Sequence, residues 1–297
     1  MSVGEEKNAV SRTFVVYHKG CPDGAMAAAV CLRALREQGV DDPVLAPASY
    51  QTPLGEVLAV REGADWADLL GATVYVLDFS FSPEDTSDLA GMVGESGSIV
   101  ILDHHKSATE RYAGWTSPPN VELHLDLDHS GAMLAWRRFC GDLPPPAIVA
   151  YVEDYDLWRH ALPESRAVHA FLRALDMDVE RYAALLDAEV CREDFFGVQT
   201  NTFGLVPLIG SYILRANEQQ ARSLAEKPET VTFGGLAALA ACAPLHQDDV
   251  GSILASKCES GVGICWYYRD GRYKVSLRSR PVGGLEPFDC SSVAKLY

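Results

Sequence analysis

The sequence has few of the features by which membrane, secreted or disulfide-stabilised proteins are recognised. None of its apolar runs reaches the length of a membrane-spanning helix, and residues 1–12 are polar, so we expect neither a transmembrane segment nor a signal peptide. The eight cysteines are scattered without a C-x-x-C pair, and a chain of 297 residues does not need a disulfide framework. We therefore expect reduced thiols and a soluble, cytoplasmic protein.

Positive charge is also scarce. The chain has 25 Lys and Arg against 41 Asp and Glu, a net charge of −16. This balance argues against a broad basic surface for extended duplex DNA, so a phosphorylated substrate would need a local cluster or bound metal. The sequence contains neither a Walker A loop nor a G-x-G-x-x-G loop, and a glycine loop that cradles a nucleotide is therefore not predicted.

Acidic and imidazole side chains follow three apolar runs, at residues 13–17, 71–77 and 98–102. They are His18 and Asp23, then Asp78, then Asp103, His104 and His105. Parallel strands end at one edge of a sheet, and buried carboxylates repel one another unless a cation neutralises them. The pattern predicts a site for a divalent cation such as Mn²⁺, Mg²⁺ or Zn²⁺. Taken singly, Asp103 and Asp23 have an alternative, which is to cap the helix that follows each of them.

The remaining pattern up to residue 158 fits a mainly parallel sheet flanked by helices. Further strands are expected at residues 44–50 and 121–126, and helices after Gly24, after Pro83 and after Ser130. A further apolar helix from Ala147 ends in an acidic group made up of Glu153, Asp154 and Asp156. That group is either a solvated helix end or a source of metal ligands.

The last third of the chain has a different composition. Residues 164–227 are predicted to be mostly helical, ending in a long helix from about residue 203 to residue 224. Strands are then expected near residues 230–233, 262–268 and 273–279, the last two joined by a hairpin at Asp270-Gly271. We therefore expect a second, smaller α/β domain that the long helix joins to the first.

Four blocks of the sequence resemble the DHH phosphoesterases, a family that includes RecJ-like proteins. The blocks are His18-x-x-Cys21-x-Asp23-Gly24, Asp78, the triplet Asp103-His104-His105, and residues 152–158. Residues 275–279 resemble part of the DHHA1 domain that usually follows. The resemblance implies a catalytic metal-binding domain over residues 1–195, a helical connector over 196–228, and a partial DHHA1-like substrate-binding domain over 229–297.

The same resemblance implies a two-metal hydrolase, usually with Mn²⁺, that cleaves phosphodiester or phosphoanhydride bonds in small nucleotides or short oligonucleotides by means of an activated water. Asp78 would bridge the metals and Asp103 would support an imidazole. The other implied metal ligands are His18, Asp23, His104 and Asp154, with Cys21 as a further candidate, and the implied substrate contacts are His105 and Arg278. Asp78, His104 and His105 would together form the catalytic group.

Two departures from the family pattern leave alternatives open. Cys21 stands where the family commonly has an aspartate, so one metal site loses an oxygen ligand. The Gly-Gly-Gly-His motif of the DHHA1 domain is absent, so the resemblance to that domain is incomplete. A catalytically weak or inactive nucleotide-binding or phosphate-binding protein is therefore the alternative function, and a structural zinc protein is a third. Oligomeric state is left open, with a homodimer among the alternatives.

Overall fold

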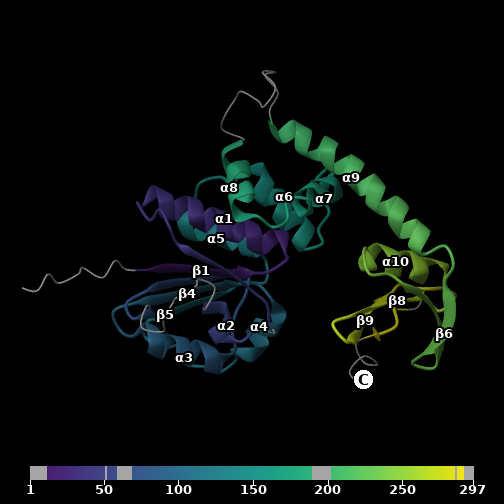
Figure 1. The fold of residues 1–297 in the computed structure, drawn as a ribbon, viewed down its shortest axis with the longest axis horizontal. Helices are drawn as coiled ribbons and strands as arrows, with labels where there is room; N and C mark the ends of the chain where they lie inside the picture. The colour runs from purple at the N-terminus through teal and green to yellow at the C-terminus, as the bar shows by residue number, and fades with distance from the viewer. Residues whose placement is uncertain (1–11, 51, 59–68, 189–201, 285, 291–297) are drawn as a thin grey trace, which may run out of the picture. The chain divides into compact units, whose positions relative to one another are not determined.

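The computed structural model describes residues 12–50, 52–58, 69–188, 202–284 and 286–290, with only the backbone described at residues 58, 188, 202 and 203. The chain forms two compact units, Met1–Ser211 and Tyr212–Tyr297. Figure 1 labels most of the elements of each unit. The division falls within a long helix, α9 (Thr202–Leu224). The domain boundaries at residues 195 and 228 remain a prediction.

The first unit is built on a parallel sheet of five strands in the order β2-β1-β3-β4-β5. The strands are β1 (Thr13–His18), β2 (Val44–Ala48), β3 (Thr73–Leu77), β4 (Ser98–Asp103) and β5 (Val121–Leu125). The predicted mainly parallel α/β architecture is confirmed. After β1 the chain goes outward to β2 and then returns to the other side of β1 for β3. The carboxyl ends of β1 and β3 thus flank the point where strand order reverses, which is where sheets of this kind open a crevice.

Helices cover both faces of this sheet, as Figure 1 shows. On one side lie α1 (Pro22–Glu37), α5 (Gly131–Cys140), α6 (Ala147–Asp156), α7 (Ser165–Arg173) and α8 (Val179–Ala188). On the other side lie α2 (Leu54–Leu58), α3 (Pro83–Val93) and α4 (Lys106–Arg111). Strand β1 explains the arrangement, because Val15 packs into one apolar cluster whereas Phe14 and Val16 pack into the other. A strand buried on both faces gives the unbroken apolar runs seen in the sequence.

Two helix starts follow the rules read from the sequence. Ser82 precedes α3, and its side chain accepts a hydrogen bond from the backbone N–H of Asp85. Ser130 precedes α5, and its hydroxyl oxygen accepts from the backbone N–H of Met133. These caps fix the loops after β3 and β5 and so set where α3 and α5 begin.

The second unit contains a sheet of four strands in the order β6-β7-β8-β9, and a packed helix together with the end of α9 contributes to its apolar core. Its elements are β6 (Glu229–Phe233), β7 (Leu236–Cys242), α10 (Gln247–Lys257), β8 (Val262–Arg269) and β9 (Arg272–Ser279). The predicted hairpin is present, with β8 and β9 antiparallel and positive φ angles at Asp270 and Gly271. Across the residues that the model describes, no helix has both the length and the apolarity that crossing a membrane requires.

Candidate metal centre

The side chains that follow β1, β3 and β4 meet at one edge of the first sheet. Two groups of three ligand atoms lie there, His18 with Asp78 and His105, and Asp23 with Asp78 and His104. Within each group the ligand atoms lie within 4.8 Å of one another. Asp78 belongs to both groups, so its two carboxylate oxygens connect them.

Asp78 is held between two imidazoles. Its Oδ1 lies 3.0 Å from His104 Nε2, and its Oδ2 lies 3.3 Å from His18 Nδ1. The first contact is a hydrogen bond, but Asp78 Oδ2 and His18 Nδ1 are buried and have no hydrogen-bond partner. Because buried polar atoms are nearly always satisfied, this unpartnered pair fits a cation between the two side chains.

The backbone around Asp78 is tightly constrained. Asp78 has φ of 55°, a left-handed conformation that aspartate tolerates better than most residues. Its N–H donates to the carbonyl of Leu102 at 2.9 Å. A Cβ placed on Gly131 would come within 2.9 Å of Asp78 Cα and closer still to its Cβ, so only glycine fits at the start of α5. The Asp78 carboxylate is therefore fixed by its backbone before any ligand binds.

Asp23 caps a helix, but not the helix in which it lies. It belongs to the first turn of α1, and its two oxygens accept from the backbone N–H groups of Gly131 (2.6 Å) and Ala132 (2.9 Å) at the start of α5. The alternative read from the sequence, a cap for the helix that follows, is therefore wrong. The contact places a carboxylate at a helix N-terminus, where the helix dipole favours negative charge.

His104 and His105 point to different partners. His104 Nε2 lies 3.0 Å from Asp78 and 3.6 Å from Asp23. His105 Nδ1 lies 2.8 Å from Asp103, which also accepts from the backbone N–H of His105. Asp103 is fully buried and does not cap α4, whose N-cap residue is His105. Asp103 thus orients the ring of His105 through its Nδ1.

The charges of the cluster shift one another's pKa values. Burial alone would raise the pKa of Asp78, but the imidazoles of His104 and His18 more than offset this and hold it below its usual range. Burial, together with the charges of Asp78 and Asp156, raises the pKa of Asp23 well above normal. For His104, the hydrogen bond to Asp78 and the nearby carboxylates outweigh burial and raise its pKa to about 9. Asp23 and His104 thus hold their protons more tightly than usual whereas Asp78 loses its proton readily, and a divalent cation would compete with protons for the same oxygens and nitrogens.

Among the described residues, neither Asp154 nor Asp156 of the fourth block belongs to either ligand group, but the two acids have different partners. Asp154 Oδ1 accepts from the N–H of Ala161 at 2.8 Å, and Asp154 is absent from both ligand groups in the described chain. Asp156, two residues on, instead brings its Oδ2 to 3.4 Å from His104 Nε2. Burial and the charge of Asp78 raise the pKa of Asp156. Sequence reasoning grouped Asp156 with Asp154 and Glu153 but did not select it.

Cys21 and Arg278 were the remaining candidates. Cys21 is the N-cap residue of α1, and burial followed by the charges of Asp78 and Asp23 raises the pKa of its thiol. A protonated thiol is a poor metal ligand. Arg278 lies on β9 of the second unit, where its guanidinium donates to Asp248 and to the carbonyl of Leu277. Its role as a substrate contact stays a prediction.

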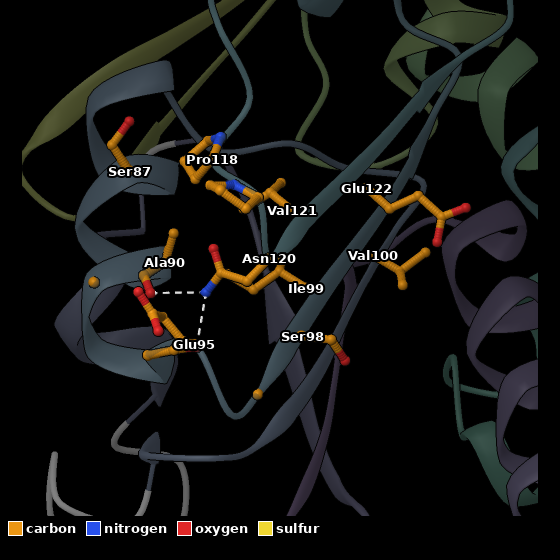
Figure 2. A pocket seen from close by; sticks show the side chains of 14 residues that line it. Ser87, Ala90, Glu95, Ser98, Ile99, Val100, Pro118, Asn120, Val121 and Glu122 are labelled. Carbon is orange, nitrogen blue, oxygen red and sulfur yellow. Dashed lines mark hydrogen bonds between the residues drawn. The ribbon is translucent and has the colours of Figure 1, made fainter.

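A separate pocket lies at the opposite end of the strands (Figure 2). It is lined by the end of α3 and the starts of β4 and β5, and Asn120 Nδ2 donates there to the carbonyls of Ala90 and Gly94. Its acidic residues are Glu95 and Glu122, and no predicted site residue lines it. The candidate chemistry is therefore at the carboxyl edge of the sheet rather than in this pocket.

No protein-family model matches the chain. Among curated proteins, it is similar to an uncharacterized protein of Acanthamoeba polyphaga mimivirus, at 22% identity over 181 residues that cover 59% of this chain and 40% of the viral protein. The chain therefore spans less than half the length of that relative.

Solved structures similar to the chain include an exopolyphosphatase-related protein from Bacteroides fragilis, at 12% identity and a TM-score of 0.49, covering 91% of this chain and 79% of that one. RecJ from Thermus thermophilus in complex with Mn²⁺ has 19% identity and a TM-score of 0.44, covering 91% and 45%. A DHH domain described as a member of an S1p family of ribosomal proteins has 14% identity and a TM-score of 0.43, covering 87% and 72%.

These neighbours are of the kind that the sequence blocks resemble. Their names include RecJ and a DHH domain, and one of them is described in complex with Mn²⁺. The architecture of this chain is defined by its own strand order, and the candidate site by its own side-chain geometry.

Proposed function

We propose that the chain is a metal-dependent phosphoesterase that hydrolyses phosphodiester or phosphoanhydride bonds in small nucleotides or short oligonucleotides. The observation that carries this proposal is the pair of ligand groups that share the buried carboxylate of Asp78. A carboxylate with an imidazole on each side suits two divalent cations at short separation, with Mn²⁺ or Mg²⁺ preferred for oxygen-rich ligands.

One cation would be held by Asp23, Asp78 and His104, and the second by Asp78 and His18. We assign Asp156, rather than the predicted Asp154, to the first position because its oxygen approaches His104. When bound, the two cations supply a water of lowered pKa and offset negative charge on the phosphoryl group.

The protein's own contribution is positioning. Asp78 is fixed by its backbone and by Gly131, and Asp23 is fixed by two N–H groups of α5. Asp103 fixes the ring of His105 through its Nδ1, and the Nε2 of that ring is proposed to contact a phosphoryl oxygen. Ligands that are already held lose little freedom on binding, which favours both affinity and correct geometry.

The test is hydrolysis of bis-p-nitrophenyl phosphate and of a panel of dinucleotides with added Mn²⁺. Asp78→Asn should reduce kcat/KM by about a hundredfold or more, since even supporting residues of metal sites cost roughly 10- to 100-fold. Asp187→Asn, a change at an exposed acid on α8, serves as the matched control and should leave the rate unchanged. Equal rates for wild type and Asp78→Asn would refute the enzyme proposal.

The alternative is a binding protein of the same fold with little or no turnover. It is favoured by Cys21, whose raised thiol pKa leaves the expected oxygen ligand of one site unreplaced. Calorimetry separates the two proposals. Mn²⁺ and nucleotide binding that Asp78→Asn abolishes, with no hydrolysis by the wild type, would support the binding protein.

A further inference from the structure

An arginine and a tyrosine outside the predicted site form a fixed pair beside the candidate metal centre. Arg111 is the last residue of α4, and Tyr50 follows β2. The guanidinium carbon of Arg111 lies 5.2 Å from the centroid of the Tyr50 ring. This is the geometry of a cation–π contact, which holds a cation without neutralising its charge.

Hydrogen bonds donated by its N–H groups also hold the same guanidinium in place. Nη2 of Arg111 donates to the hydroxyl of Ser80 at 3.2 Å and to the carbonyl of Ser80 at 3.4 Å. Its Nε donates to the carbonyl of Ser107 at 3.2 Å. Ser80 is fully buried in the loop after β3, two residues beyond Asp78. Arg111 is thus anchored to the loop that carries the central carboxylate.

The ring of Tyr50 connects the pair to the metal centre. Its centroid lies 5.6 Å from that of His18 and 5.7 Å from that of His105, and both rings meet it edge-on. These two histidines, with Asp78, form one of the ligand groups. Tyr50 is 44% exposed, so the pair lies at the rim of the centre rather than beneath it.

Two other arginines are already paired with carboxylates. Arg159 forms an ion pair with Glu153 at 2.7 Å, and Arg278 is paired with Asp248. Arg111 is exposed and has no carboxylate partner in the part of the chain that the model describes. It is therefore a fixed positive charge beside an acidic cluster, with donors still available for an anion.

We propose that Arg111, seated on Tyr50, binds a second phosphate group adjacent to the phosphoryl group at the metal centre. This inference rests on the proposed function and narrows its substrate class to compounds with at least two neighbouring phosphates, as in a phosphoanhydride or a terminally phosphorylated dinucleotide. Arg111, rather than Arg278, supplies the guanidinium that recognises phosphate oxygens in the first unit. The ion pair with a phosphate strengthens because the guanidinium is already immobilised.

The test compares thymidylyl-thymidine with the same dinucleotide carrying a phosphate at either end. In the wild type with Mn²⁺, one phosphorylated form should have the higher kcat/KM. Arg111→Gln should reduce that preference by about 10- to 100-fold, the loss expected for a hydrogen-bonded charge pair, mainly through KM. Arg181→Gln, an exposed arginine on α8, is the matched control and should retain the wild-type preference.

Two further variants separate recognition from a structural role. Tyr50→Phe keeps the ring beneath the guanidinium and should retain more of the preference than Tyr50→Leu. If Arg111 only ties α4 to the loop of Ser80, Arg111→Gln will slow all three dinucleotides equally, and the inference is overturned.

Binding of inorganic pyrophosphate, measured by calorimetry with Mn²⁺, tests the inference even without turnover. A loss of about tenfold or more in Arg111→Gln, with binding of orthophosphate reduced less, supports it. Equal losses for the two anions contradict it. Failure of hydrolysis in the wild type would refute the proposed function while leaving this binding result decisive for Arg111.

Discussion

Replacing Gly131 with alanine should damage the metal centre without touching any ligand. The added Cβ would come within 2.9 Å of the Cα and Cγ of Asp78 and closer still to its Cβ. These are not flexible atoms, because Asp78 is held in a left-handed backbone conformation and its N–H is bonded to Leu102. Gly131 cannot retreat freely either, since its own N–H donates to Asp23. The clash must therefore move α5, Asp78 or both.

The expected cost follows from these contacts. Forcing an extra methyl group into a packed site typically costs about 1–3 kcal/mol. Gly91→Ala in α3 is the matched control, because its Cβ would meet nothing within 4 Å. Helix propensity should make that variant more stable than the wild type by about 0.5 kcal/mol. Both substitutions replace glycine with alanine, but they should change the free energy of unfolding in opposite directions.

Urea denaturation followed by circular dichroism measures both free energies of unfolding. Titration calorimetry with Mn²⁺ then measures the effect on the centre, where Gly131→Ala should weaken binding and Gly91→Ala should not. A Gly131→Ala protein with wild-type stability and wild-type Mn²⁺ affinity would show that Asp78 is not held as described, and the proposed pre-positioning would fail.

Two other predictions test the charges of the site and its surroundings. Cys21→Asp supplies the oxygen ligand that the first block lacks and should tighten Mn²⁺ binding by about tenfold in calorimetry. Cys21→Asn is the control, because asparagine can cap α1 equally well but should not tighten Mn²⁺ binding. Similar affinities for both variants would exclude a metal ligand at this position. His169 stacks on Tyr155 with ring centroids 3.5 Å apart, and burial, followed by the charges of Arg173 and His160, lowers its pKa from 6.5 to about 3. Between these pH values only the unfolded chain binds the proton, so the stability of the wild type falls as the pH drops. In urea unfolding, the free energy of unfolding of His169→Phe should therefore gain about 1–2 kcal/mol relative to the wild type between roughly pH 7 and pH 5. A difference between the two proteins that does not change with pH would contradict the lowered pKa of His169.

Much of the fold could be predicted because each strand carries its own signal. The apolar runs of β1, β3 and β4 are buried on both faces, so their hydrophobicity is continuous and easy to recognise. The start of α3 was marked by Pro83 and that of α5 by a serine cap at Ser130. The hairpin of β8 and β9 was marked by Asp270-Gly271, where the turn requires positive φ angles. These are local rules, and they need no knowledge of what packs where.

The site was harder to predict because its details are set by contacts between distant segments. The acids after β1, β3 and β4 could be grouped by assuming a common sheet edge. Which acid of α6 reaches the cluster depends on how that helix packs, and the structure brings Asp156 rather than Asp154. The partners of Asp23 at α5 are 108 and 109 residues away in the sequence, and no local sequence pattern predicts them. Tyr50 had no sequence signal at all.

The span of the ligand set along the chain has a consequence for folding kinetics. His18 and Asp156 are 138 residues apart in the sequence, and Asp78 is positioned by Gly131, which lies 53 residues further along the chain. Contacts of such large sequence separation form late in folding, after most of the loop-closure entropy has been lost. A cation that needs the finished geometry therefore has little to bind in the transition state. We expect Mn²⁺ to leave the refolding rate almost unchanged and to slow unfolding. The metal would then stabilise the native state kinetically without assisting its formation.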